Sequence, residues 1–142
     1  MNERYIKWYT PWLSREFEML VFGDKRGVPL VLFSTSGARY YENKDFGLVG
    51  AIASYVDNGK VTVYCPDAID LEYLPNMPDP WKYNHMGIIL GTGEWDNTRD
   101  ETYRLSGILN SRGIKHWLDD GKWRGHDWNY WRDMLPYYLS VL

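Results

Sequence analysis

Apolar residues alternate with polar ones near the start of the chain and predict two adjoining strands. Residues 5–14 (YIKWYTPWLS) and 15–24 (REFEMLVFGD) both read as extended segments, and alternation with a period of two begins at Phe17. Glycine and proline in the following GDKRGVP, residues 23–29, predict a turn. We therefore expect an antiparallel pair of strands here.

Four further runs of consecutive apolar residues predict buried strands. Continuous runs of this kind are typical of strands that are covered on both faces, as in parallel sheets. The runs are VPLVLFS (residues 28–34), VTVYC (61–65), MGIILGTG (86–93) and IKHWLDDG (114–121).

Helical spacing of apolar residues predicts three helices among these strands. The first covers residues 46–56 and stops before Gly59, and the second is the amphipathic stretch DETYRLSGILNSRG, residues 100–113. The third covers residues 127–142 and contains Pro136, where we expect a kink.

This alternation of strands and helices predicts one α/β domain over residues 1–142. We expect three α/β/α layers and a mainly parallel sheet, preceded by the antiparallel pair. The exception is residues 66–85, a connection with four of the 7 prolines and one short helical turn at residues 81–85. Connections of this length are unusual in a compact domain and are often functional.

Net charge, apolar runs and cysteine content exclude several classes of binding partner for this protein. A net charge of -3 provides no basic face for nucleic acid, and no apolar run approaches the roughly 18 residues of a membrane span. The single cysteine, Cys65, fits a reducing compartment, and the first residues lack the apolar core of a secretory signal. We therefore expect a cytoplasmic protein that binds neither nucleic acid nor membrane.

The spacing of histidines argues against a metal site. His85, His116 and His126 have no ligand spacing with one another or with Cys65. The stretch GTGEWD, residues 91–96, lacks the third glycine of a dinucleotide-binding fingerprint. We expect neither a metal nor a cofactor.

Two predicted strand ends carry residues that are suited to acid–base chemistry. Ligands of open α/β sheets bind at the carboxyl ends of strands, and Asp96 follows one predicted strand while His126 follows the next. A carboxylate beside a histidine sets the imidazole tautomer and stabilises the imidazolium. Simpler interpretations stay open: His126 makes one local hydrogen bond, Asp127 caps the last helix, and Asp96 opens the helix near Asp100.

Motifs along almost the whole chain resemble those of a family of small bacterial esterases with the α/β-hydrolase fold. The resemblance rests on WYTPWLSREFEMLVFG, VPLVLFSTSGARYYENKDFGLV, VTVYCPDAID, LPNMPDPW, ILGTGEWD, RLSGILNSRGIKHWLD and GHDWNYWRDMLPYYL. It implies that Asp96 is the acid and His126 the base of a catalytic triad. It also implies that the loop of Thr35, Ser36 and Gly37 contributes to an oxyanion hole.

The nucleophile of that family is missing from this sequence. Enzymes of this fold carry their serine in a Gly-x-Ser-x-Gly elbow, and none of the 142 residues form that motif. Its expected place falls between VTVYC and LPNMPDPW, where Tyr73 runs directly into Leu74. The resemblance thus implies a reduced α/β-hydrolase, in which the strands flanking the missing segment meet in one six-stranded sheet.

Two other side chains are candidates for the missing nucleophile. Ser36 lies on the loop after a predicted central strand, although serine in turns commonly bonds to nearby backbone. Cys65 ends a predicted strand, but its neighbours Val63 and Tyr64 indicate a buried, inert thiol. Either nucleophile would also need a positioned base.

Two functions therefore stay open. The first is a serine-esterase-like protein whose hydrolysis of a small acyl ester is lost or very weak. The second is a minimal scaffold or binding protein without catalysis, of natural or engineered origin. Sheet edges exposed by the missing segment would favour a homodimer.

Overall fold

The structure is a computed structural model that divides into two compact units, each with its own sheet. The first unit comprises Met1–Asp70 and Leu135–Leu142, and the second comprises Leu71–Met134. The described residues are 1–11, 13–35, 38–67 and 80–142.

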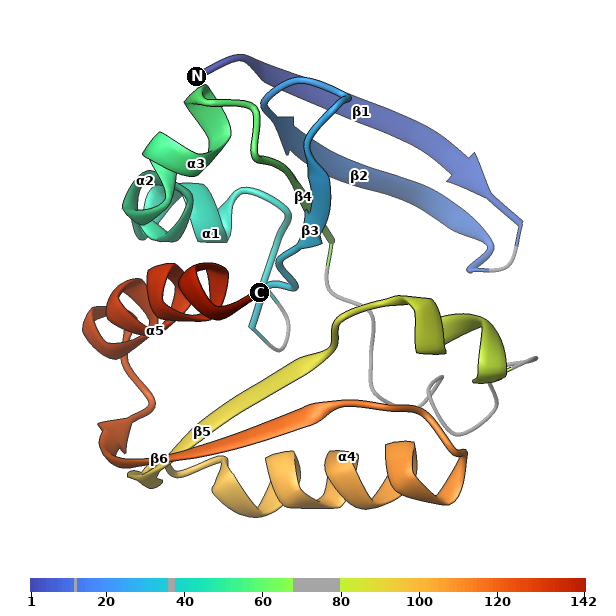
Figure 1. Cartoon of the computed structure of the whole chain (residues 1–142). Coiled ribbons are helices and arrows are strands. Elements are labelled where there is room, and N and C mark those ends of the chain that lie inside the picture. The colour runs from blue at the N-terminus through green and yellow to red at the C-terminus, as the bar shows by residue number, and fades with distance from the viewer. Residues whose placement is uncertain (12, 36–37, 68–79) are drawn as a thin grey trace. The chain divides into compact units, whose positions relative to one another are not determined.

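The first unit contains a four-stranded sheet in the order β1-β2-β4-β3 (Figure 1). Its strands are β1 (Glu3–Thr10), β2 (Arg15–Phe22), β3 (Val28–Val31) and β4 (Val61–Pro66). β2 is antiparallel to both β1 and β4, whereas β3 and β4 are parallel. The predicted antiparallel pair at the amino-terminal end is therefore confirmed.

The core of the first unit lies where this sheet meets a run of short helices. Val21, Phe22 and Val63 from the strands and Val49 and Ile52 from the helical segment are almost completely buried. Burying a side chain of this size contributes about 1.5–3 kcal/mol. The apolar pattern of β2 and β4 thus provides the stability that holds the sheet to its helices.

The helix predicted for residues 46–56 is broken into short pieces. The structure has α1 (Glu42–Asp45), α2 (Leu48–Ala51) and α3 (Ala53–Asp57) in its place. Gly47 separates α1 from α2 with a φ of 79°, a left-handed conformation that glycine adopts without steric cost. The apolar spacing agrees with α2 and α3, but a continuous helix was wrong because Ile52, with a φ of -113° and a ψ of 17°, leaves the helical conformation between them.

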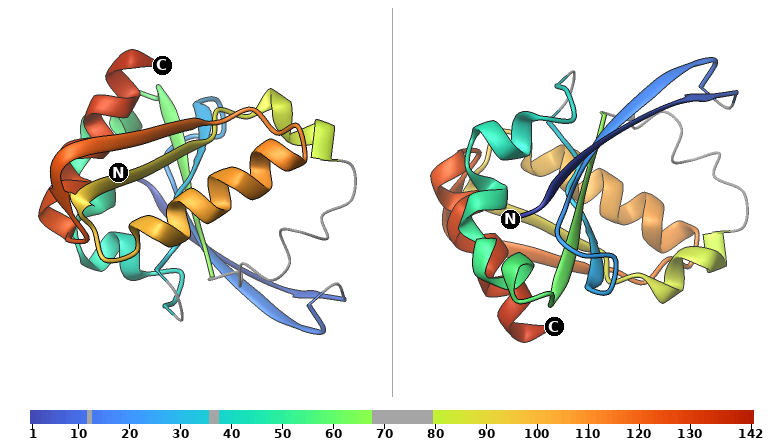
Figure 2. Two further views of the ribbon diagram at one scale, coloured as in Figure 1. Left: turned by 90° about the horizontal axis from the view of Figure 1, so that it is seen from below. Right: turned by 90° about the horizontal axis from the view of Figure 1, so that it is seen from above.

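The second unit pairs two parallel strands and covers them with a helix (Figure 2). Strands β5 (Ile89–Trp95) and β6 (Trp117–Gly125) are joined through α4 (Arg99–Ser111), which packs against β5. A 3-10 helix, η2 (Pro80–His85), precedes them, and α5 (Trp128–Val141) follows. All five elements overlap the segments that the sequence predicts, but β6 begins three residues and ends four residues later than the predicted strand of residues 114–121.

A bulge interrupts β6 just before it ends. Gly93 of β5 pairs with Gly121 of β6, but Trp95 pairs with Gly125, so β6 advances four residues while β5 advances two. The extra residues bring the backbone of Arg124 against Gly93. Bulges of this kind re-aim the residues that follow, and here the residue that follows is His126.

The single six-stranded, mainly parallel sheet was a wrong prediction for the described residues. Their strands form one sheet of four and one of two, and hydrogen bonds join β3 to β4. Pro29 lies within β3, and proline has no N–H for a ladder on a second side, so it is typical of edge strands.

Candidate active site

Asp96 lies directly after β5 and accepts hydrogen bonds at both carboxylate oxygens. The backbone N–H and the hydroxyl of Thr98 each donate to Oδ1 at 2.8 Å, and the hydroxyl of Thr92 donates to Oδ2 at 3.2 Å. The side chain is only 4% exposed. Thr98 also precedes α4, so Asp96 opens that helix as well, as its simpler interpretation predicts.

These contacts keep Asp96 ionised. Burial by itself raises the pKa of the Asp96 carboxyl, but the hydrogen bonds from Thr98 and the nearby charge of His126 outweigh it. The pKa of Asp96 is therefore lowered from its ordinary value. At neutral pH the site contains a carboxylate that can only accept hydrogen bonds.

His126 faces this carboxylate from the end of β6. Its Nδ1 lies 3.0 Å from Oδ1 of Asp96 and 3.1 Å from the hydroxyl of Thr98. The ring of Trp131 meets the imidazole edge-on, with centroids 4.7 Å apart. Its neighbour Asp127 accepts the backbone N–H of Asn129 at 2.7 Å, which confirms the predicted cap of α5.

The geometry assigns one tautomer to the neutral imidazole. Because the Asp96 carboxylate cannot donate, Nδ1 of His126 carries the hydrogen and donates it. Nε2 is then the basic nitrogen, and within the described part of the chain it has no hydrogen-bond partner. The His126 side chain is 35% exposed, so the imidazole is not sealed off from solvent.

The predicted oxyanion loop lies in the first unit, and its described donor is already in use. The backbone N–H of Thr35 donates to Glu42 Oε2 at 2.8 Å, and the Thr35 hydroxyl donates to Oε1 at 2.8 Å. The chain's own carboxylate thus occupies a position that could bind an anion. Ser36 and Gly37 lie outside the described residues, so their predicted roles stay predictions.

Cys65 is not accessible to a substrate. It lies inside the sheet, where it pairs with Leu20 of β2, and its exposed fraction is 0%. Burial raises the pKa of the Cys65 thiol to about 12. The interpretation as a buried, inert thiol agrees with this position.

We expect the folded protein not to react with a thiol-specific disulfide reagent at about pH 8, because the reactive species is the thiolate. The protein should instead take up one equivalent after unfolding in denaturant. The release of the reagent's chromophore measures the reaction of the folded protein and that of the unfolded protein. Rapid stoichiometric reaction of the native protein would contradict the buried position.

A serine–histidine contact apart from the Asp96–His126 pair was not predicted. The Ser106 hydroxyl and His116 Nε2 lie 2.7 Å apart, and His116 Nδ1 lies 3.0 Å from the carbonyl oxygen of Ile114. Ser106 is only 6% exposed, so an ester carbonyl cannot reach it. We assign this pair a structural role, joining α4 to the segment before β6.

Sequence reasoning also missed Thr92 and Thr98, which hold Asp96 in place. A usable signal for Thr98 was its position two residues after an aspartate and directly before a helix, where side chains commonly bond to the backbone. Thr92 gave no such signal, because its contact depends on the path of β5.

The described part of the chain offers no candidate metal centre and no candidate membrane span. There, no group of three histidine, cysteine, aspartate or glutamate side chains is arranged to hold a metal ion. None of the described helices combines the length and the apolar character that crossing a bilayer requires.

Solved structures of known enzymes share this fold. No family model and no curated protein matches the sequence. A ferulic acid esterase matches with a TM-score of 0.62 and 11% identity over 99% of this chain and 96% of that one.

Two proteins of Staphylococcus aureus match at 8% identity over 99% of this chain. They are the S-formylglutathione hydrolase FrmB, with a TM-score of 0.59 and 99% of its chain covered, and the fluorophosphonate-binding serine hydrolase FphF, with 0.62 and 97%. At such identities the likeness concerns the fold. The chain therefore has an α/β fold similar to that of esterase-type α/β-hydrolases.

Proposed function

We propose that this chain is a serine-esterase-like α/β-hydrolase derivative that retains an acid–base pair but hydrolyses esters very weakly. The observation that supports it most is the 3.0 Å contact between His126 Nδ1 and Asp96 Oδ1, with the imidazole partly exposed and Nε2 unpartnered among the described residues. A histidine held in this tautomer by a buried carboxylate has the arrangement of a general base.

The weakness of the reaction follows from the missing nucleophile. The sequence contains no Gly-x-Ser-x-Gly elbow, which we attribute to loss of the central segment of an ancestral hydrolase. Absence of the elbow removes both the serine and the backbone N–H of the residue after it, which is one donor of the oxyanion hole. Only the residual effects of binding and polarisation then remain, about 10³–10⁴ over water in an intact site.

Without a serine, water is the nucleophile in the proposed mechanism. His126 Nε2 accepts a proton from a water molecule as the water oxygen bonds to the carbonyl carbon of a small acyl ester. The resulting imidazolium, stabilised by Asp96, returns the proton to the departing alkoxide as the carbon–oxygen bond breaks. The products are one carboxylic acid and one alcohol.

The second candidate is a scaffold or binding protein without catalysis. The contact of Thr35 with Glu42 favours it, because a backbone donor bound to a carboxylate is not free to stabilise a developing oxyanion. Under this alternative the Asp96–His126 pair contributes only to the local structure between β5 and β6.

A kinetic comparison separates the two candidates. We expect His126→Ala to lower the protein-dependent hydrolysis of p-nitrophenyl acetate at least about tenfold, because general-base catalysis contributes roughly 10²–10⁴. His85→Ala is the matched control, since His85 is an exposed histidine whose loss reports the nonspecific reactivity of surface imidazoles. Equal rates for the wild type and both variants would favour the scaffold.

Covalent labelling tests the missing nucleophile in the same protein. A fluorophosphonate probe should leave the chain unlabelled by intact-mass measurement, because Ser106, which contacts a histidine, is buried and out of the probe's reach. Stoichiometric labelling of Ser36, followed by loss of activity, would instead show a working serine enzyme and would contradict the proposal of weak hydrolysis.

A further inference from the structure

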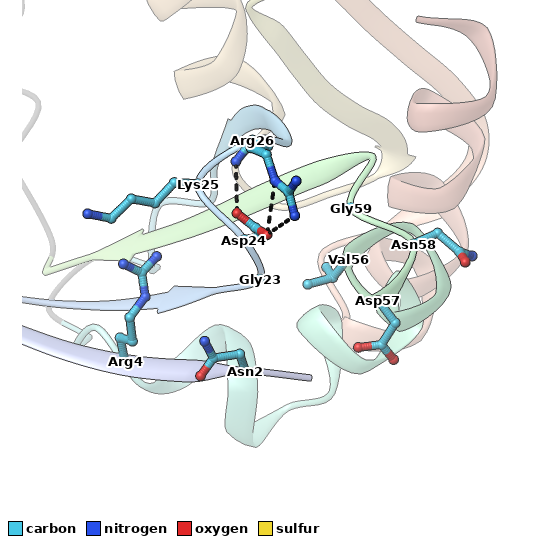
Figure 3. Close-up of a pocket in the computed structure, with 10 residues that line it drawn as sticks. All are labelled: Asn2, Arg4, Gly23, Asp24, Lys25, Arg26, Val56, Asp57, Asn58 and Gly59. Carbon is cyan, nitrogen blue, oxygen red and sulfur yellow. Dashed lines mark hydrogen bonds and ion pairs between the residues drawn. The ribbon is translucent and has the colours of Figure 1, made fainter.

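A hollow of about 590 Å³ opens in the first unit. Neither Asp96 nor His126 is among the residues that line it. It lies between the start of β1, the turn after β2 and the end of α3. Figure 3 shows Arg4 and Lys25 along one side of this hollow, while Val56 points in from the opposite side. Small-molecule sites commonly measure about 300–1,000 Å³, so the hollow has room for one small ligand.

Two positive charges in this hollow are not neutralised by the protein. Arg26 pairs with Asp24 at 2.7 Å, and Asp57 pairs with the amino group of Met1 at 3.2 Å. Arg4 and Lys25 also line the hollow, and neither has a carboxylate partner among the described residues. The lining therefore attracts anions through these two side chains.

Arg4 is also incompletely satisfied as a hydrogen-bond donor. Its Nε is buried and has no hydrogen-bond partner in the described structure. A buried donor left unpaired is unfavourable, so Arg4 gains if its side chain turns to meet an acceptor oxygen. The site thus offers both charge and donors to a polyoxygen anion.

We propose that this hollow binds a small phosphate monoester, with Arg4 and Lys25 on its phosphate group. The planar guanidinium matches two oxygens of a phosphate, and the ammonium of Lys25 adds a second charge against a dianion. The volume exceeds that of a phosphate alone, so an organic group occupies the remainder. Apart from Val56 the side chains around it are polar, which favours a sugar-like group.

Titration of the ¹⁵N-labelled chain with glucose 6-phosphate, inorganic phosphate and glucose tests this site. We expect saturable shifts of backbone amides in residues 23–26 and 56–59 with glucose 6-phosphate. Weaker binding of inorganic phosphate and none of glucose should accompany them. Added salt should weaken the binding, because exposed charges are screened.

Substitutions of Arg4 and Lys25 test whether these two side chains bind the phosphate group. Arg4→Gln and Lys25→Gln should each weaken binding about tenfold, the effect of one lost charge-assisted contact. Arg104→Gln, at an exposed arginine of α4, should leave it unchanged. Lys25 is exposed, so its variant remains informative even if Arg4→Gln folds poorly.

Three outcomes would overturn the proposal. They are the absence of saturable binding below about 10 mM, an affinity unaffected by both cation variants, and equal affinities for inorganic phosphate and glucose 6-phosphate. The last would leave an anion site without specificity for a monoester. None of these results depends on ester hydrolysis.

Discussion

Replacement of Gly93 by alanine is expected to lower the free energy of unfolding by about 3 kcal/mol, at the upper end of the usual cost of overpacking. A Cβ at this position would lie 2.7 Å from the carbonyl carbon of Arg124 and closer still to its oxygen. Both are backbone atoms, which cannot rotate away as a side chain can. Strands β5 and β6 must therefore separate at the bulge.

This separation should also disturb the candidate site. Gly93 precedes Asp96 by three residues, and the bulged segment of β6 leads directly to His126. Moving the backbone of Arg124 away from β5 moves His126 away from the Asp96 carboxylate. We expect the p-nitrophenyl acetate rate of Gly93→Ala to fall together with its stability.

Urea unfolding followed by tryptophan fluorescence measures the loss, and Gly107→Ala is the control. Gly107 lies inside α4, where an added Cβ meets no atom within 4 Å. Alanine should stabilise the helix there by about 0.5–1 kcal/mol. A Gly93→Ala protein that is as stable as the wild type would show that the Arg124 backbone does not approach Gly93.

Replacement of Asp96 by asparagine should lower the free energy of unfolding by about 2 kcal/mol near neutral pH. Asparagine keeps the size of the side chain but removes the charge that strengthens the bonds from Thr98 and His126. The neutral amide also cannot stabilise a protonated imidazole. The variant therefore separates the effect of charge from that of packing.

The effect of this substitution should depend on pH. The pKa of Asp96 is lowered in the folded state, so its stabilising contribution is complete above the ordinary pKa of an aspartate. The contribution is lost as the pH falls through the lowered, folded-state pKa. The stability difference between the wild type and Asp96→Asn should therefore narrow as the pH falls from about 7 to about 3.

Urea unfolding at several pH values checks this expectation. The control is Asp133→Asn, at an exposed aspartate of α5, which should change stability by less than about 0.5 kcal/mol. A difference for Asp96→Asn that is the same at every pH would mean that the carboxylate is not stabilised in the folded protein.

The candidate acid and base could be predicted because each stands at the end of a recognisable strand. The apolar runs that became β5 and β6 located Asp96 and His126 at neighbouring strand ends. Parallel pairing then brings such ends to one edge of a sheet. The threonine donors around Asp96 could not be predicted, because their contacts depend on where the backbone turns after β5.

The other differences between the predicted and the observed structure also arise from the path of the backbone and from contacts that local sequence does not indicate. The pattern of residues 46–56 is apolar at helical spacing, yet the backbone leaves the helical conformation at Ile52 and separates α2 from α3. Likewise Thr35 follows a strand, as the sequence predicts, but nothing local indicated that Glu42 would bind it.

By itself the sequence determined the positions of the strands, α4 and α5, the absence of a nucleophile elbow, and the candidate pair Asp96 and His126. Only the tertiary structure decided which strands pair, how the bulge in β6 aims His126, and which charges around the hollow stay unpaired. Apolar periodicity is a local property, because it reflects which face of an element is buried. Strand partners, and whether a given charged side chain finds a partner, depend on contacts between residues far apart in the chain, which no local pattern records.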